Sequence, residues 1–449
     1  MLRYSFLLFF TLLFLNNTNA QIQIGNTTVD TSTVISGLDI PWEIHLGPDG
    51  WLWTTERYGR VSRINPETGE QDIILDINEI VTQRSESGLL GLTLHPDFAN
   101  TPEVFLVYTF GPTNDIKERL VKYTYENGQL VSPVTLIDNI PGNSTHNGSR
   151  LVILPDNTLL MTTGDAKDEP GSQDLSKLSG KILRLNLDGS IPIDNPFPSS
   201  YIYSLGHRNA QGLALSPKGI IYSSEHGPNT DDEFQIIEEG ENYGWPNVKG
   251  FCNTSEEMAF CNDNDVVEPL VAWTPTIATS DIAYYNNDAI PEWKNTVLMT
   301  VLKNKRLTAL KLSEDGKDVV SQEDYLIGTF KRLRDIAVAE DGTIYLATNG
   351  DSWNNNNPFT HRIVKLKSQL ITSTYSITNS DAISLFPNPA NDIVHVKGTF
   401  EKIKIFNSNG KSVIETSQST FSTENLLPGV YSVVFELKEG TNSQKLIIK

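Results

Sequence analysis

The strongest constraint in the sequence is a local pattern that recurs six times between residues 21 and 367: a short turn followed by a strand of alternating or β-branched residues. The six strands are expected at 51–55, 104–108, 159–163, 220–224, 297–300 and 344–348. Turns followed by short strands at a spacing of tens of residues are typical of propeller blades, each of which is one small sheet. Long amphipathic helical patterns are almost absent. The sequence therefore predicts an all-β fold, with a six-bladed β-propeller over residues 21–367.

The C-terminal part differs from the rest of the chain in its composition and in its strand pattern. Residues 368–380 are rich in Ser and Thr, which predicts a linker. Residues 381–449 hold several short strand patterns, including Ile403 to Lys411 and Leu427 to Val433, and no catalytic constellation. We expect this region to form a small C-terminal β-sandwich.

The N-terminus has the pattern of a secretory signal peptide. Arg3 precedes an apolar run over residues 6–15, and the small residue Ala20 follows at the position that a signal peptidase reads. The run is too short to span a bilayer, and no later stretch reaches that length. The sequence predicts a signal peptide over residues 1–20 and no integral membrane segment.

The charge composition indicates which classes of binding partner are disfavoured. Asp and Glu outnumber Lys and Arg by 55 to 35, which gives a net charge of −20 at pH 7. Phosphate binding needs concentrated positive charge, so a nucleic-acid partner is disfavoured. An acidic chain suits an extracellular life and offers oxygen ligands to Ca²⁺, although solubility alone also explains the charge.

The two cysteines are close together. Cys252 and Cys261 flank a polar stretch in a chain that is directed for export. A local disulfide is the expected state, and a metal site is disfavoured because no His or further Cys stands nearby.

Several polar residues lie in the predicted loops, and each alone has an ordinary explanation. A histidine in a Ser/Asn/Gly loop is usually solvated, an aspartate after a glycine usually forms an Asx turn, and paired arginines are often surface cations. The oxygen-rich turn at 227–233 fits a solvated turn or a structural Ca²⁺ loop. The other candidates are His146, Asp165, Arg208, Asn209, Lys303, Arg332 and Arg334.

Taken in order and spacing, the loops and strands from about Ile35 to Leu366 resemble the soluble PQQ-dependent glucose and aldose dehydrogenases, the glucose/sorbosone dehydrogenase group. The matching stretches are Gly88-Leu89-Leu90-Gly91, His95-Pro96-Asp97-Phe98, Thr163-Gly164-Asp165, Gly180-Lys181-Ile182-Leu183-Arg184, Gly206-His207-Arg208-Asn209, Glu225-His226-Gly227-Pro228-Asn229, Asn242-Tyr243-Gly244-Trp245-Pro246, Leu302-Lys303 and Arg332-Leu333-Arg334-Asp335.

The resemblance implies a secreted quinoprotein that oxidises the C1 hydroxyl of aldose sugars to the lactone and passes electrons to an external acceptor. PQQ (pyrroloquinoline quinone) carries three carboxylates, which suit fixed cations, and Ca²⁺ suits hard oxygen ligands. The implied roles are: His146 as general base oriented by Asp165; Arg208, assisted by Asn209, at the quinone oxygen; Lys303, Arg332 and Arg334 on the PQQ carboxylates; the carbonyls of Gly227 and Pro228 on Ca²⁺; and Asp232, Glu233 and Tyr243 in a second Ca²⁺ site or a structural loop.

The substrate wall departs from the glucose-specific members of the group. Glu86 stands where those members have Gln, and Leu270 stands where an aromatic residue is often found, whereas Trp273 keeps the aromatic wall. A carboxylate only accepts hydrogen bonds, and fewer paired polar contacts give weaker discrimination between sugars. We therefore expect a broad aldose dehydrogenase.

The C-terminal unit resembles the sorting domain of the type IX secretion system, through Phe386-Pro387-Asn388-Pro389-Ala390, Pro428-Gly429-Val430-Tyr431 and the basic last residue. This resemblance implies the type IX machinery as a partner and a secreted or cell-surface location. Two other functions stay open for the propeller. One is a Ca²⁺-dependent lactonase, which would not need the cations at 303, 332 and 334. The other is a non-catalytic extracellular propeller that binds carbohydrate or protein, which would not need His146.

Overall fold

The structure is a computed structural model of the 449-residue chain, and it describes residues 20–351, 360–369, 383–407, 411–437 and 440–449. The chain forms two compact units that divide between Gln369 and Leu370. In the described residues, no helix is both long and apolar enough to cross a membrane.

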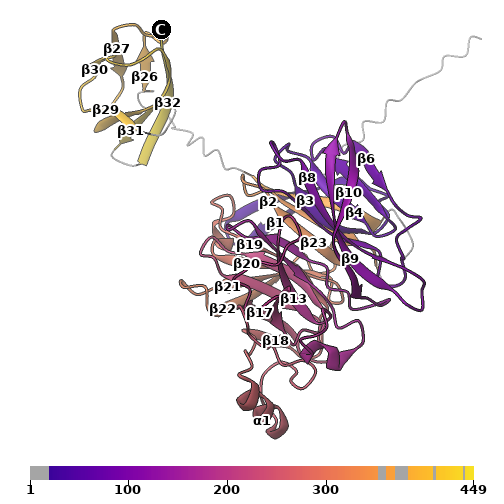
Figure 1. The fold of residues 1–449 in the computed structure, drawn as a ribbon. Coiled ribbons are helices and arrows are strands. Elements are labelled where there is room, and N and C mark those ends of the chain that lie inside the picture. The colour runs from indigo at the N-terminus through magenta and orange to yellow at the C-terminus, as the bar shows by residue number, and fades with distance from the viewer. Residues whose placement is uncertain (1–19, 352–359, 370–382, 408–410, 438–439) are drawn as a thin grey trace, which may run out of the picture. The chain divides into compact units, whose positions relative to one another are not determined.

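The first unit contains six antiparallel sheets (Figure 1), and in five of them the strands follow one another in chain order. Sheet one is β3 (Pro41–Leu46), β4 (Leu52–Glu56), β5 (Arg60–Ile64) and β6 (Gln71–Asp76); sheet two is β7 (Leu89–Leu94), β8 (Glu103–Phe110), β9 (Lys117–Glu126) and β10 (Gln129–Pro141); sheet three is β11 (Leu151–Ile153), β12 (Thr158–Thr162), β13 (Lys181–Asn186) and β14 (Ile202–Leu205). Sheet four is β15 (Ala210–Leu215), β16 (Ile221–Glu225), β17 (Asp232–Ile237) and β18 (Val271–Trp273); sheet five is β19 (Thr279–Tyr285), β20 (Thr296–Val301), β21 (Arg306–Leu312) and β22 (Val319–Tyr325); sheet six is β23 (Leu333–Val338), β24 (Ile344–Asn349), β25 (His361–Ser368), β2 (Thr27–Ser36) and β1 (Ala20–Ile24).

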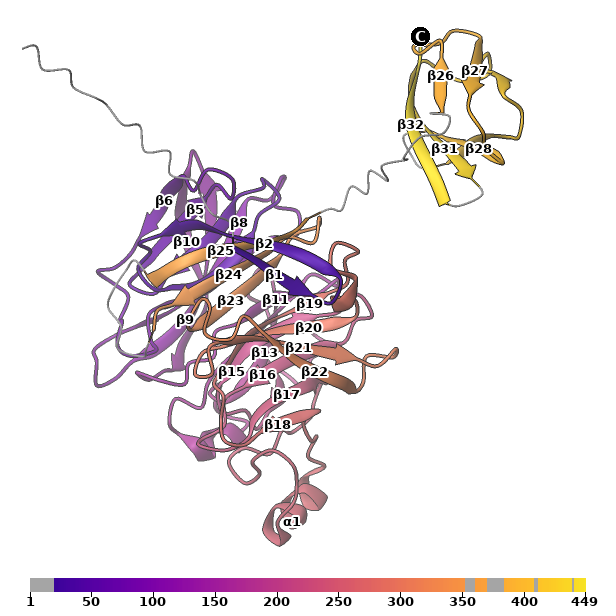
Figure 2. The same cartoon turned by 180° about the vertical axis from the view of Figure 1, so that it is seen from behind.

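The six sheets close into a ring. The first strands β3, β7, β11, β15, β19 and β23 each contact the next, and β23 returns to contact β3. The N-terminal strand β2 pairs antiparallel with β25, so that the last blade combines both ends of the unit (Figure 2). The predicted six-bladed propeller is confirmed.

Each of the six predicted turn-and-strand copies is the second strand of one blade: β4, β8, β12, β16, β20 and β24. Every residue of β4, β12, β16, β20 and β24 is buried, because these strands lie inside a sheet and between neighbouring blades. This explains why the copies are β-branched and apolar runs rather than strict alternations. Aromatic packing between blades is dense at Trp53, whose ring centroid lies 5.3 Å from that of Phe98 and 5.0 Å from that of Tyr125.

The second unit is a two-sheet sandwich, as the sequence predicts. One sheet is β26 (Ser384–Phe386), β27 (Ile393–Lys397) and β30 (Thr420–Ser422); the other is β29 (Ser412–Thr416), β28 (Lys402–Phe406), β31 (Gly429–Leu437) and β32 (Gly440–Ile448). Its core is built by alternating inward residues such as Ile403, Ile405, Val433 and Phe435.

The predicted domain boundaries fall largely outside the described residues. Ala20, the last residue of the predicted signal peptide, opens β1, and residues 1–19 lie outside the description. Ser368, the first residue of the predicted linker, is the last residue of β25, and residues 370–380 also lie outside. These boundaries stay predictions.

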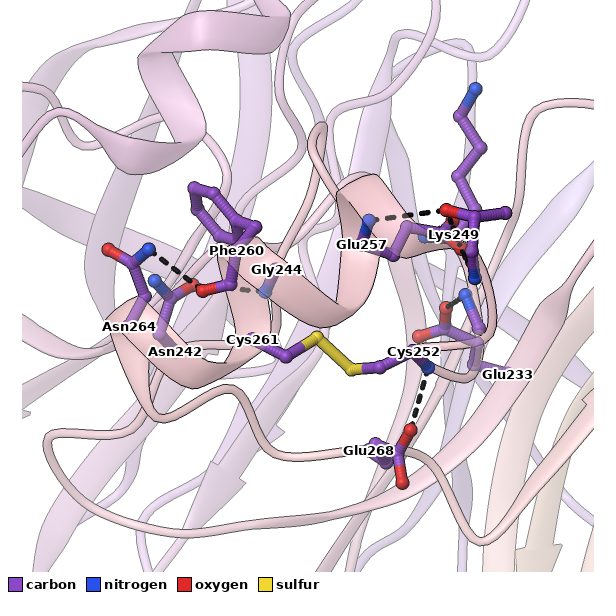
Figure 3. Close-up of a disulfide and its surroundings, with 12 residues drawn as sticks. Glu233, Asn242, Gly244, Lys249, Cys252, Glu257, Phe260, Cys261, Asn264 and Glu268 are labelled. Atoms are coloured by element: carbon purple, nitrogen blue, oxygen red, sulfur yellow. Dashed lines mark hydrogen bonds between the residues drawn. A yellow bond between two sulfur atoms is a disulfide. The ribbon is translucent and has the colours of Figure 1, made fainter.

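The connection from β17 to β18 holds the helix α1 (Ser255–Asn264) and the predicted disulfide between Cys252 and Cys261 (Figure 3). Thr254 begins the helix in a reciprocal capping box with Glu257, which satisfies two otherwise orphan amides. Glu268 accepts a hydrogen bond from the amide of Cys252 at 2.6 Å. The helix buries none of its own residues.

Candidate active site

Most of the predicted site residues come from loops, or from the strand ends next to them, at one end of the propeller. Because the strands are antiparallel, the loop that enters a first strand and the loop that follows a second strand lie at the same end of a blade. Glu86, His146, Arg208 with Asn209, and Arg332 enter or precede β7, β11, β15 and β23, whereas Asp165, Gly227 with Pro228, and Lys303 follow β12, β16 and β20.

His146 and Asp165 form a directly bonded pair. The Nδ1 atom of His146 lies 2.8 Å from Oδ1 of Asp165, whose side chain is fully buried. Asp165 also accepts hydrogen bonds from the indole of Trp245 at 3.0 Å and the amide of Lys167 at 2.8 Å. An ionised carboxylate only accepts, so the Nδ1 atom carries the proton and Nε2 presents its lone pair. The His146 side chain keeps 18% exposure, which leaves it accessible to a ligand.

Arg208 contacts the other ring nitrogen of that histidine. Its Nη2 lies 3.2 Å from Nε2 of His146, and its Nη1 donates to the carbonyl of His226 at 2.9 Å. Its guanidinium also lies over the ring of Trp245, 5.3 Å from the centroid. The carboxylate of Glu225 accepts from the amide of Arg208, which fixes the start of the loop.

The backbone of His146 has a left-handed conformation, with φ at 61°. Glu86 accepts the amide hydrogen of His146 at 2.8 Å, so the predicted substrate residue also positions the predicted base. The crossing at Gly164 is very close, since a Cβ atom there would lie 1.9 Å from the carbonyl oxygen of His146. Only glycine fits at that position.

Arg334 is a buried cation with neutral partners. Its guanidinium donates to Gln211 at 2.9 Å, to Asn349 at 3.1 Å and to Ser280 at 3.4 Å, and the residue is 4% exposed. Burial, followed by the nearby charge of Arg332, lowers the pKa of Arg334 to about 9. A buried cation is costly unless an anion compensates it.

The other two predicted cations, Arg332 and Lys303, differ in burial. Burial, then the charge of Arg57, lowers the pKa of Arg332. Lys303 is exposed and donates to Thr276 at 3.2 Å. A narrow cavity is lined by Trp42, Glu86, Leu90, Asn147, Gly148, Gln211 and Arg334. A buried guanidinium at a cavity fits a ligand that carries a carboxylate.

The Gly227 loop is tied down by Asp232. Its carboxylate accepts the amides of Gly227 at 2.8 Å, Ile277 at 2.7 Å and Ala278 at 2.6 Å. This pattern matches the structural-loop alternative for Asp232. Asp232 thereby connects the Gly227 loop to Ile277 and Ala278. The carbonyl of Ile277 in turn accepts a hydrogen bond from the amide of Lys303 at 3.1 Å.

A second small pocket is lined in part by Arg208, Gly227, Pro228, Glu233 and Tyr243. Burial, followed by the charge of Glu225, raises the pKa of Glu233 well above its usual value. A cation beside this carboxylate would relieve its burial, and hard oxygen donors suit Ca²⁺. The hydroxyl of Tyr243 is engaged, since it donates to Ile236 at 2.8 Å and accepts from Glu238 at 2.9 Å.

Trp273 makes its hydrogen bond toward the neighbouring blade. Its indole donates to Gln322 on β22 at 3.0 Å, and both Trp273 and Leu270 pack against the hydrophobic cluster between sheets four and five. The substrate role of Trp273 stays a prediction.

Sequence reasoning gave no role to the residues on the propeller axis. Arg150, directly before β11, pairs with Glu43 on β3 at 2.7 Å, with Asp281 on β19 at 3.3 Å, and with Asp335 on β23. We call these four residues the axial cluster. The three carboxylates lie close enough together to suggest a metal site, but the guanidinium of Arg150 already pairs with each of them.

Gln211 and Trp245 were also missed. Gln211 on β15 joins Arg334 to the side-chain oxygen of Asn209, which lies 3.2 Å from its amide nitrogen. Trp245 stands in a sequence stretch that resembles the family and Gln211 lies two residues after another, but their bonds depend on partners from other blades.

Comparison with known proteins supports the same grouping. Residues 38–355 match the family model for glucose/sorbosone dehydrogenases, and residues 384–449 match that for a secretion system C-terminal sorting domain. Quinoprotein glucose dehydrogenase B of Acinetobacter calcoaceticus is 32% identical over 403 residues, covering 70% of this chain and 84% of that protein. Aldose sugar dehydrogenase YliI of Escherichia coli is 30% identical over 343 residues, covering 72% and 91%.

The fold agrees with solved structures. The PQQ-bound form of aldose sugar dehydrogenase from Streptomyces coelicolor superimposes with a TM-score of 0.67 at 32% identity, covering 76% of this chain and 98% of that one. The family match spans most of the propeller, and the loops that it covers carry the His146–Asp165 pair and the buried arginines. This chain therefore belongs to the glucose/sorbosone dehydrogenase family and ends in a secretion system sorting domain.

Proposed function

We propose that this protein is a secreted, PQQ-dependent and Ca²⁺-dependent aldose dehydrogenase that oxidises the C1 hydroxyl of a cyclic sugar to the lactone. The observation that carries the proposal is the meeting of a bonded His146–Asp165 pair with Arg208 in a site that also contains the buried cation Arg334. The names of the relatives and the PQQ-bound structure support the choice of cofactor.

His146 acts as the general base. Its Nε2 atom removes the proton from the anomeric hydroxyl, while the hydrogen on C1 leaves with two electrons and the C1–O bond becomes the lactone carbonyl. Asp165 keeps the proton on Nδ1 and stabilises the imidazolium that forms. Arg208 presents a fixed positive charge beside Nε2. It would stabilise the negative charge that develops on the quinone oxygen.

The cofactors supply the redox chemistry. When bound, PQQ provides the two-electron acceptor and Ca²⁺ provides Lewis-acid polarisation. Arg332, Arg334 and Lys303 would hold the PQQ carboxylates, Asn209 would assist Arg208, and the carbonyls of Gly227 and Pro228 would bind Ca²⁺. A second Ca²⁺ beside Glu233 and Tyr243 remains part of the proposal, and Asp232 holds the loop. Turnover also needs an external electron acceptor.

The lactonase alternative has one feature in its favour, a buried Ser204–His207–Glu225 array. The hydroxyl of Ser204 lies 2.8 Å from His207, which lies 3.0 Å from Glu225. Ser204 and His207 are fully buried, and Glu225 also accepts the amide of Asn209 at 3.0 Å. These contacts describe a positioning network rather than an open nucleophile. A binding-only propeller is disfavoured by the accessible His146 base.

Reconstitution tests the proposal directly. Protein stripped of metal and cofactor should be inert with an artificial acceptor dye and an aldose, and should recover only when PQQ and Ca²⁺ are both added. Aldose oxidation with NAD and no quinone would contradict it.

We also propose that the enzyme accepts several aldoses. Glu86 only accepts hydrogen bonds, and Leu270 offers no aromatic platform, so few contacts distinguish hydroxyl patterns. The measurement is kcat/KM across glucose, galactose, xylose, arabinose and maltose. A preference for glucose above about a hundredfold over every other sugar would refute broad specificity.

The C-terminal unit is proposed to direct type IX export to the cell surface or the medium, through the sorting-domain match at residues 384–449. Removal of residues 381–449 should leave kcat unchanged in purified protein and abolish surface delivery in cells that carry this secretion system. A folded but inactive truncation would show that the C-terminal unit completes the site.

A further inference from the structure

A fourth cation, Arg57, belongs to the same end of the propeller as the predicted cofactor cations. It follows β4 directly, in one of the loops that build the site. Its amide donates to Ile40 at 3.1 Å and its carbonyl accepts from Leu89 at 2.9 Å, so its backbone is fixed against the start of β7. No role follows for it from the family stretches in the sequence.

The side chain of Arg57 passes along Gly88, next to the loop that carries Glu86. A Cβ atom at Gly88 would lie 2.5 Å from Cγ of Arg57 and 2.1 Å from its carbonyl oxygen. Glycine at position 88 therefore leaves the room through which the aliphatic stem runs. The Nε atom of Arg57 is buried and has no hydrogen-bond partner in the described part of the chain.

Arg57 lies within electrostatic reach of the other site charges. Burial lowers the pKa of Arg57, and the carboxylate of Glu86 opposes that change. The charge of Arg57 in turn contributes to the lowered pKa values of Arg332 and Arg334. We call Arg57, Arg332 and Arg334 the cation group. Like charges held together away from water repel, and an anionic ligand relieves the repulsion.

The charges near Arg57 indicate what the group could do. Lys303 and the cation group bring four positive charges to this end of the propeller, and Glu86 brings one negative charge. PQQ carries three carboxylates. Without Arg57, Glu86 would offset one of the three remaining cations, which would weaken the attraction for that ligand.

We propose that Arg57 is a further cofactor-binding residue, whose guanidinium binds a PQQ carboxylate and offsets the negative charge of Glu86. The inference rests on the proposed function, and it assigns to this chain's own residues a charge pairing that adjusts the site for a carboxylate at position 86.

The test is direct titration of apo-protein with PQQ in the presence of Ca²⁺, followed by quenching of tryptophan fluorescence. R57Q should raise the Kd for PQQ at least tenfold, whereas R60Q, a matched control three residues along on β5, should stay within twofold. Arg60 pairs with Asp76 at 3.0 Å and is exposed. R57K keeps the charge and the stem, and should raise the Kd at least threefold because an ammonium cannot make the bidentate contact.

The charge pairing has its own readout. E86Q alone should bind PQQ at least twofold more tightly, and E86Q in the R57Q background should restore part of the lost affinity, which a merely structural role of Arg57 would not produce. Unchanged PQQ affinity in R57Q, or in R57K if R57Q does not fold, would overturn the inference alone. Wild-type protein that fails to bind PQQ would overturn the proposed function and this inference with it.

Discussion

Two groups of buried charge lie in the propeller, and they are compensated in opposite ways. In the axial cluster, one guanidinium pairs with three carboxylates: Arg150 meets Glu43 at 2.7 Å, Asp281 at 3.3 Å, and Asp335. In the cation group, Arg334 donates to the neutral side chains of Gln211, Asn349 and Ser280. The axial cluster joins strands of different blades through paired charges, whereas the cation group keeps a buried positive charge that the proposed PQQ would compensate.

The pKa directions record the same contrast. Burial opposes the charge of Arg150, but its carboxylate partners raise its pKa above the usual value. Burial lowers the pKa of Arg334, and neighbouring arginines lower it further. Removing a charge should therefore destabilise the protein in the axial cluster and relieve repulsion in the cation group.

The largest effect is expected from R150M. It leaves three buried carboxylates without their cation, and loss of one partner of a buried ion pair typically costs about 3–5 kcal/mol of unfolding free energy. Urea unfolding of apo-protein measures the loss. R119Q, which breaks an exposed pair with Asp138 at 2.9 Å, is the control and should cost at most about 1 kcal/mol. Equal stabilities for the two variants would remove the structural role of the axial cluster.

H146A should separate catalysis from both charge groups. A general base contributes about 10²–10⁴-fold to turnover. We expect kcat to fall by that amount on a good aldose, while PQQ affinity and unfolding free energy stay near wild type. Near wild-type kcat would show that another group accepts the proton.

R334Q should show the opposite pattern to R150M. A neutral side chain removes repulsion with Arg332, so the apo-protein should unfold at the same or a higher denaturant concentration. PQQ affinity should fall at least about tenfold, because charged hydrogen bonds contribute about 1.5–3 kcal/mol each. A destabilised apo-protein with unchanged PQQ affinity would place Arg334 with the axial cluster.

Glu118 on β9 shows a third way to avoid a buried charge, because it is expected to keep its proton in the folded protein. It is fully buried and accepts from Ser149 at 2.5 Å, and burial raises its pKa to about 8. Because the folded pKa exceeds the unfolded value, its contribution to stability is present below pH 4.5 and is lost as the pH rises through 8. The stability of wild type relative to E118Q should therefore fall by about 1.4 kcal/mol per pH unit between pH 5 and 8, and then level off. A difference that does not change with pH would mean that Glu118 is not neutral in the folded protein.

The sequence predicted the repeating parts of the fold well because each blade carries its own turn and its own buried second strand. The loops that hold His146 and Asp165 lie at a common end of the propeller, because both positions follow from strand order. The axial cluster could not be predicted this way. The partners of Arg150 lie 107 residues away at Glu43 and on the far side of the ring at Asp335, and only closure of the ring brings them together.

Ring closure was also beyond local patterns. Local patterns do not show that β2 joins the last blade, because the choice of partner depends on where the ring ends. Arg57 was missed for a related reason: its side chain becomes a site residue only through the gap left by Gly88 in the next blade.

The pairing of β2 with β25 also sets the order in which the propeller assembles. Asp30 and Gln369 are hydrogen-bonded across 339 residues of chain. Closing a loop of that length costs roughly 5 kcal/mol of chain entropy, and no local contact offsets it before the intervening blades exist. The other five blades can form from neighbouring segments as they emerge, whereas the sixth has to wait for both ends of the unit. We therefore expect the closing ladder to be the slow step of folding, and until it forms β25 presents an open strand edge to any other chain nearby.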